Sequence, residues 1–161
     1  DTTAQNKPLV KEPLPPPARP AEPLPEKPVA RLPMAYESDT ESPHSVIIIL
    51  DKVDGIFVNE SKNAFNLYNR QAYYGKSFTI SHEVLNETIK LVRIQPFANA
   101  NEAIAYLDKV RKVAETDIIP WLPAEKYRFI ITSDKNLETL RTKKDLLEYT
   151  NFLKSTFPGK F

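Results

Sequence analysis

The pattern of hydrophobic and polar positions predicts four β-strands, all of them after residue 44. SVIIILDK, residues 45–52, is an unbroken aliphatic and β-branched run, which is typical of a central strand buried on both faces. Later runs rich in strand-forming residues predict further strands at 77–85, 88–97 and 127–133. Asn86 and Glu87 separate the second strand from the third and form a reasonable hairpin turn.

Apolar residues at spacings of three and four predict a helix after the first strand and another after the third. The first helix covers residues 60–74 and has Gly75 just past its end as a C-cap. The second begins with a capping box, Asn99 followed by Glu102, and runs to about Thr116.

The segment after the fourth strand predicts additional helical structure. We expect a short helical turn at 135–140 and a last helix at 143–156, with Thr142 as its N-cap. The apolar stripe of this last helix consists of Leu146, Tyr149 and Leu153. We expect the stripe to pack on the core of the same domain.

The predicted order of elements is β α β β α β, followed by an extra C-terminal helix. Two interlocked right-handed β-α-β units in this order give an α+β fold of the ferredoxin-like, split βαβ type. Such a fold has a four-stranded antiparallel sheet with the first and third strands in the centre, and two helices cover one face. This architecture carries many unrelated activities, so function has to be inferred from the sites on it.

Proline content separates a leader from this domain. Of the 15 prolines, eleven lie in residues 1–44. Proline lacks a backbone donor and has a fixed φ, which favours extended polyproline II and disfavours helices and paired strands. We therefore expect 1–44 to be a disordered, flexible linker and 45–161 to be an interaction domain. The prolines at 15–20 could also form a PxxP ligand, although any segment this rich in proline contains such spacings by chance.

Charge and composition exclude several classes of function. The net charge is +1, divided into −2 for residues 1–44 and +3 for 45–161, which argues against binding nucleic acid or an anionic membrane through bulk charge. The chain has no Cys, so it offers no disulfide, thiolate metal site, Cys nucleophile or lipid-anchoring Cys. The longest aliphatic run, 46–50, is far shorter than the roughly 20 residues that span a bilayer. Because the first residue is Asp1, we expect a processed product or a fragment of a longer protein.

Candidate chemistry is sparse along the chain. Asp51 and Asp54 end the first strand, and two carboxylates at this spacing could hold a divalent cation, although we favour a strand end and an Asp-Gly turn. His44 and His82 are the only histidines, and neither predicts a metal site. The third strand lacks the alternating aromatics of an RNA-recognition module, and the chain has no Gly-rich phosphate loop. We therefore expect no cofactor, no metal and no catalytic residue.

The second strand and the first helix form the candidate partner surface. This strand lies at an edge of the predicted sheet, where unpaired backbone groups invite an added strand. In the groove between it and the helix, we expect five side chains to contact a protein partner: Asn66, Asn69, Arg70, Tyr73 and Tyr74. A solvated helix face explains the polar members of this group equally well.

Several motifs of the domain occur in a recognisable order. They are LDK at 50–52, FNLYNRQAYY at 65–74, VRIQPF at 92–97, NANEAIAYLDKV at 99–110 and the tail at 127–157. In this order they resemble the C-terminal domain of the PorW/SprE family, tetratricopeptide-bearing outer-membrane lipoproteins of type IX secretion and gliding motility in Bacteroidota. The most specific positions of the resemblance are Asn69, Arg70, Tyr73, Tyr74, Asn136, Lys144, Asp145, Tyr149 and Phe152. The chain departs from the family in having no helical repeats and no lipobox Cys.

This resemblance implies a non-enzymatic protein-interaction module in a cell-envelope complex, on the periplasmic face of the outer membrane. It brings no catalytic motif. Residues 92–110 are also similar to the strand-helix unit of SPOR domains, the peptidoglycan-binding modules of bacterial envelopes. That likeness implies peptidoglycan as an alternative ligand, and a small hydrolase is the third alternative.

Overall fold

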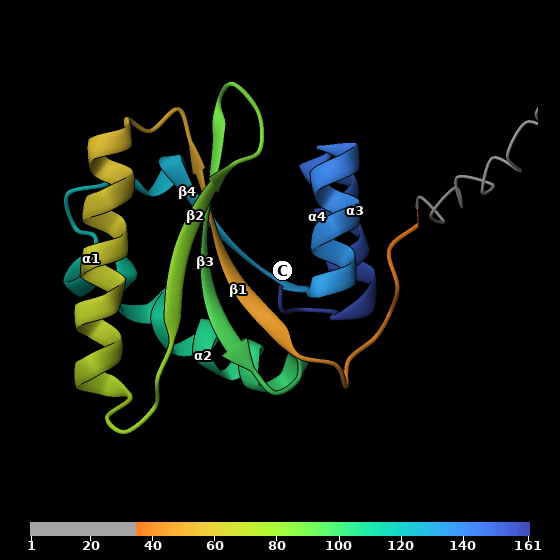
Figure 1. Ribbon diagram of the computed structural model, residues 1–161, viewed down its shortest axis with the longest axis horizontal. Helices are drawn as coiled ribbons and strands as arrows, with labels where there is room; N and C mark the ends of the chain where they lie inside the picture. The colour runs from red at the N-terminus through yellow and green to blue at the C-terminus, as the bar shows by residue number, and fades with distance from the viewer. Residues whose placement is uncertain (1–34) are drawn as a thin grey trace, which may run out of the picture. The chain divides into compact units, whose positions relative to one another are not determined.

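The computed structural model describes residues 35–161 (Figure 1). The disorder that we expect for residues 1–34 of the Pro-rich leader therefore concerns residues outside those described. The strands of the described part are β1 (His44–Asp51), β2 (Thr79–Val84), β3 (Ile89–Phe97) and β4 (Tyr127–Ser133). Its α-helices are α1 (Gly55–Ala72), α2 (Ala100–Val113), α3 (Asp134–Lys143) and α4 (Leu146–Thr156).

The strands form one antiparallel sheet in the order β2-β3-β1-β4. β1 and β3 are central and β2 and β4 are edges, which confirms the predicted ferredoxin-like split βαβ arrangement. The unbroken apolar run fits the centre of the sheet, because every residue from His44 to Leu50 is buried. The hairpin between β2 and β3 turns at Asn86, whose side-chain oxygen accepts hydrogen bonds from the backbone N–H groups of Thr88 and Ile89.

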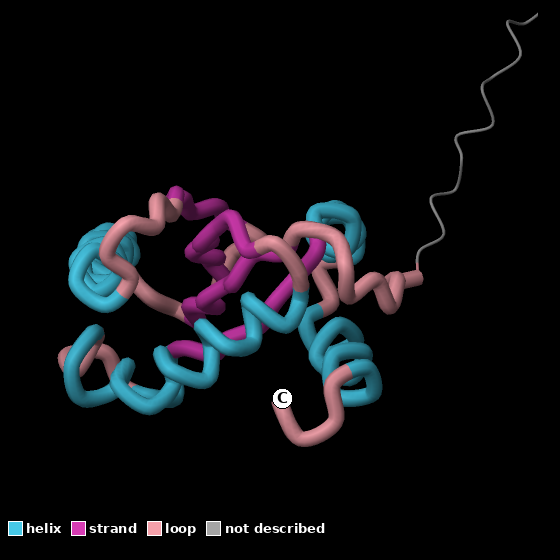
Figure 2. The backbone as a smooth tube through the Cα atoms, turned by 90° about the horizontal axis from the view of Figure 1, so that it is seen from below, coloured by secondary structure: helices cyan, strands magenta, loops and turns pink. Residues whose placement is uncertain are grey.

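Helices cover both faces of the sheet (Figures 1 and 2). α1 and α2 pack on one face, where the rings of Phe65 in α1 and Phe129 in β4 meet edge to face. α3 and α4 lie over the other face, and Arg141 of α3 forms an ion pair there with Glu83 of β2. The sequence predicts only a short turn at 135–140, but this segment belongs to the full helix α3. The C-terminal addition to the fold is therefore a pair of helices.

The start of α1 differs from the prediction because a carboxylate caps it. The Asp54 side chain accepts a hydrogen bond of 2.9 Å from the backbone N–H of Ile56, which begins the helix at Gly55 and not at residue 60. The Asp-Gly pair that we interpret as a turn is thus a helix N-terminus. This earlier start places Ile56 and Phe57 in the first turn of α1, where both side chains are exposed.

The start of α4 is also capped by a carboxylate. Asp145 accepts a hydrogen bond of 3.0 Å from the backbone N–H of Glu148, whereas Thr142, the predicted cap, lies inside α3 and donates its hydroxyl to the carbonyl of Glu138. The predicted apolar stripe is confirmed as part of the core, since all three of its members are buried: Leu146, Tyr149 and Leu153.

The segment before β1 packs on the domain. The ring of Tyr36 lies 4.6 Å from the ring of Tyr149, measured between centroids. The Asn136 side chain accepts a hydrogen bond from the backbone N–H of Glu37 and donates one to its carbonyl, each of 2.9 Å. Residues 35–43 therefore belong to the folded domain and not to the flexible linker in which the sequence places them.

Candidate functional site

The five predicted contact residues lie near the C-terminal end of α1, but the structure separates them into an inner and an outer group. Asn69 belongs to the inner group, because it is only 4% exposed and its side-chain oxygen accepts a hydrogen bond of 2.5 Å from the Tyr106 hydroxyl. Tyr73 is also inner, since its ring packs against Phe78 and Tyr106 and its hydroxyl is buried. Asn69 is therefore an interior residue, which corrects its prediction as a direct partner contact, whereas Tyr73 is half-buried against the core and its predicted contact stays a prediction.

Arg70 and Tyr74 form the outer group. Tyr74 is 94% exposed and Arg70 is also exposed. Asn66 is half-buried, so its exposure is intermediate between those of the two groups. The helical period explains the division, because Asn69 follows the buried Phe65 by four residues and so shares its face. That spacing was a signal in the sequence that could have placed Asn69 inside.

Side chains bridge the space between α1 and β2 in which the sequence predicts a groove. The Lys62 Nζ lies 3.1 Å from the His82 Nδ1, which joins the helix to the strand. Near the other end of β2, Tyr73 meets Phe78. β2 is still an edge strand. Of the five predicted contact residues, Arg70 and Tyr74 are the exposed ones, so they carry the predicted partner contact beside this strand.

The other candidate residues from the sequence include Asp54, Asp51 and His44, and their contacts are those of structural residues. Asp54 caps α1, and Asp51 is half-buried at the end of β1. His44 is 4% exposed, and its Nδ1 lies 2.7 Å from the carbonyl oxygen of Ser42. Within residues 35–161, no three His, Asp or Glu side chains gather so that they could hold a metal ion.

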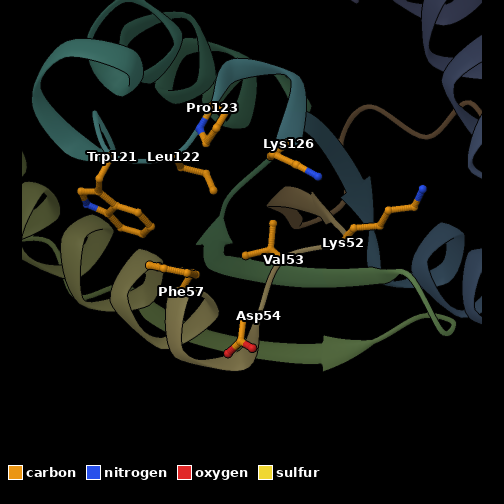
Figure 3. A pocket seen from close by; sticks show the side chains of 8 residues that line it. All are labelled: Lys52, Val53, Asp54, Phe57, Trp121, Leu122, Pro123 and Lys126. Atoms are coloured by element: carbon orange, nitrogen blue, oxygen red, sulfur yellow. The ribbon is translucent and has the colours of Figure 1, made fainter.

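A cavity of about 380 Å³ opens where the end of β1, the first turn of α1 and the loop before β4 meet (Figure 3). In this aromatic pocket the apolar lining residues are Val53, Phe57, Trp121, Leu122 and Pro123. The ring centroids of Phe57 and Trp121 lie 5.7 Å apart, and the two residues are 49% and 43% exposed. Large aromatic side chains held half open over a cavity are typical of a binding surface.

Charged residues complete the lining of the aromatic pocket: Lys52, Asp54 and Lys126. Figure 3 shows the Phe57–Trp121 pair on one side of the pocket and the two lysines on the other. Asp54 is engaged as the cap of α1, while neither lysine forms an ion pair with another residue of the described part. The pocket therefore combines an apolar wall with a positively charged side.

Hydrogen bonds from the hairpin fix the backbone of this pocket. Lys52 adopts φ 53°, in the left-handed region, and its N–H donates to the Thr88 carbonyl at 2.7 Å. The Lys90 Nζ donates to the carbonyl of Val53 at 3.0 Å. These bonds hold the turn between β1 and α1, and with it the position from which Phe57 projects.

The flank of α1 that carries Phe57 continues along the helix. Ala64, Tyr68 and Gln71 follow it at helical spacing and line a second cavity of about 390 Å³ beside the π-helical turn Ala114–Ile118. At 1.5 Å per residue, the distance from Phe57 to Gln71 along the helix is about 21 Å. This flank is long enough to contact an extended peptide segment as well as a single side chain.

Sequence reasoning missed the aromatic pocket for two reasons. The predicted helix starts at residue 60 and leaves Phe57 outside it, while the motif IIPWLP serves only to end the preceding helix. A Trp between two prolines in a loop was the available signal, because loops lie on the surface and carry binding residues.

Comparisons of the chain with family models, with curated proteins and with solved structures find no match. Over residues 35–161, no helix has the length and apolar character needed to cross a bilayer. Function is therefore inferred from the geometry of the described residues and from the motifs of the sequence.

Proposed function

We propose that this domain is a non-enzymatic protein-interaction module of a bacterial cell-envelope complex, on the periplasmic face of the outer membrane, as the PorW/SprE resemblance implies. The aromatic pocket is its partner-binding site. The observation that supports this proposal is the pair of half-exposed rings, Phe57 and Trp121, over a formed cavity. Aromatic residues that line such pockets contribute much of the binding free energy in protein interfaces.

The charges of the pocket define the partner. Its binding segment carries an apolar side chain next to an acidic one. The apolar side chain packs against Phe57 and Trp121 and gains about 25 cal/mol for each Å² of apolar surface removed from water. The acidic side chain faces Lys52 and Lys126, and this pairing fixes the orientation of the segment and speeds its encounter with the pocket.

Capture of envelope proteins on the immobilised full chain tests this site. The wild type is compared with Phe57→Ala/Trp121→Ala and with Leu147→Ala, a matched control because Leu147 is 71% exposed on α4, over the other face of the sheet. We expect the wild type and the control to retain the same envelope protein and the double variant to lose it. Retention of that protein by a folded double variant would exclude the aromatic pocket as the binding site.

Peptidoglycan binding is the second candidate function. The SPOR likeness implies it, and the exposed rings of Phe57 and Trp121 offer flat apolar faces to a sugar as well as to a side chain. Sedimentation with purified sacculi separates the two functions. A glycan binder sediments with the cell wall and loses this property in Phe57→Ala/Trp121→Ala, whereas a protein-interaction module stays in the supernatant.

A further inference from the structure

A cavity of different character lies at the free edge of β4. It has a volume of about 340 Å³ and shares no lining residue with the aromatic pocket. In this basic pocket the lining residues that carry the inference are Ile49, Arg111, Arg128, Ile130, Lys154 and Phe161. Figure 2 marks the C-terminal end of the chain, where Phe161 lies beside Arg111 of α2 and lines the cavity together with Lys154 of α4.

Three cations from three elements line the basic pocket: Arg111 of α2, Arg128 of β4 and Lys154 of α4. None of the three forms an ion pair with another residue in 35–161. All three residues are exposed, so water weakens the repulsion among their charges, but three positive charges around one cavity still favour an anion there. An anion bound between them would remove this repulsion and gain attraction to all three.

Arg111 is held in place beside the cavity. Its Nη1 donates a hydrogen bond of 2.5 Å to the Lys160 carbonyl, and its guanidinium lies 5.1 Å from the ring centroid of Phe161. Burial lowers the pKa of Arg111 from its ordinary value, while the Asp108 carboxylate acts in the opposite direction. A guanidinium nevertheless stays protonated in proteins, so a partly desolvated positive charge borders the pocket.

The floor of the basic pocket is apolar. Ile49 and Ile130 are 1% and 3% exposed, and the ring of Phe161 is half-buried at the side. An apolar group packed against the half-buried Phe161 ring displaces water from that ring, which favours binding. The pocket therefore suits a ligand with an anionic group near the cations and an apolar body against the floor.

We propose that the basic pocket binds a small phosphate monoester whose substituent is apolar and about the size of a phenyl ring. This site is independent of the proposed protein-interaction function. A phosphate monoester carries about −1.5 to −2 charges at neutral pH and three acceptor oxygens, so it matches three cations better than a carboxylate with a single charge. Guanidinium groups also donate paired, parallel hydrogen bonds to phosphate oxygens.

Titration of the full chain with phenyl phosphate, followed by amide NMR shifts at low salt, tests the proposal. We expect saturable shifts in β4 and α4 that weaken with added salt, because ions screen the attraction. In Arg128→Gln/Lys154→Gln we expect an affinity at least about tenfold lower, since two charge-assisted contacts to the phosphate are lost. Lys112→Gln is the matched control, because Lys112 follows Arg111 on α2 but does not line the pocket, and its affinity should equal that of the wild type.

Other outcomes would overturn the proposal. Shifts that never saturate would reject the site. A loss of affinity in Lys112→Gln equal to that in Arg128→Gln/Lys154→Gln would show that the effect depends only on net charge. Benzoate that binds as tightly as phenyl phosphate would reject the phosphate assignment, and inorganic phosphate that binds as tightly would reject the role of the apolar floor. The single variants Arg128→Gln and Lys154→Gln are measured as well, so the comparison remains possible if the double variant folds poorly.

Discussion

Replacing Tyr106 with Phe tests whether Asn69 is a residue of the interior. The Tyr106 side chain is 2% exposed, and its hydroxyl donates to the Asn69 Oδ1 at 2.5 Å. The Asn69 Nδ2 is buried and has no hydrogen-bond partner among the described residues. Tyr106→Phe therefore leaves both polar atoms of a buried amide without a partner.

The expected loss of stability follows from the cost of an unpaired buried group. Such a group costs about 1 to 3 kcal/mol, so we expect Tyr106→Phe to lower the free energy of unfolding by about 2 kcal/mol. Tyr106→Phe/Asn69→Leu removes both partners, and we expect it to be more stable than the single variant by at least about 1 kcal/mol. Tyr74→Phe is the control, because this side chain is 94% exposed and its replacement should change stability by no more than about 0.5 kcal/mol.

Urea unfolding of the full chain, followed by far-UV circular dichroism, measures these differences. With a slope of about 2 kcal/mol per M, the expected loss lowers the midpoint of Tyr106→Phe by about 1 M. A midpoint within about 0.2 M of the wild type would refute the reasoning. A double variant that is no more stable than Tyr106→Phe would also refute it, because the unpaired amide would then not be the cause of the loss.

Three further changes have defined outcomes. Burial, together with the carboxylate of Glu148, raises the pKa of Tyr36 from 10.0 to about 12. The neutral phenol therefore contributes stability below pH 10, and this contribution is lost as the pH rises toward 12. Between pH 10 and 12 the melting temperature should fall less in Tyr36→Phe than in the wild type, and equal falls would contradict this. Truncation after Ser133 removes α3 and α4 and should abolish cooperative thermal unfolding, whereas an unchanged melting curve would make these helices a detachable arm. Because the outer group lies at the other end of α1 from the aromatic pocket, Arg70→Ala/Tyr74→Ala should weaken partner capture less than Phe57→Ala/Trp121→Ala and leave the melting temperature unchanged, and full capture would remove the outer group from the interface.

The sheet could be predicted from the sequence because strand burial leaves a local pattern. An unbroken apolar run is typical of a strand covered on both faces, and β1 is covered in this way. The capping box was equally local, and the Asn99 side chain accepts the predicted hydrogen bond from the backbone N–H of Glu102 at 3.0 Å. With strand order and connection handedness constrained, these signals suffice for the topology.

Features that depend on distant residues could not be predicted in the same way. Residues 35–43 look like linker because their neighbours in sequence are polar, yet Tyr36 packs on Tyr149 from the other end of the domain. The aromatic pocket likewise exists only because folding brings Phe57 and Trp121 together. Periodicity indicates the side of its own element on which a residue lies, but it does not indicate which other element covers that side.

The first described residues and the aromatic pocket lie on opposite faces of the sheet. Residues 35–43 approach beside α4, whereas the pocket lies at the start of α1 (Figure 1). A partner in the pocket therefore does not compete with this segment for surface. The ring contact of Tyr36 and the paired hydrogen bonds from Asn136 connect the segment to α4 and α3. The backbone N–H of Ala100, at the start of α2, also donates a hydrogen bond of 3.0 Å to the carbonyl of Thr40.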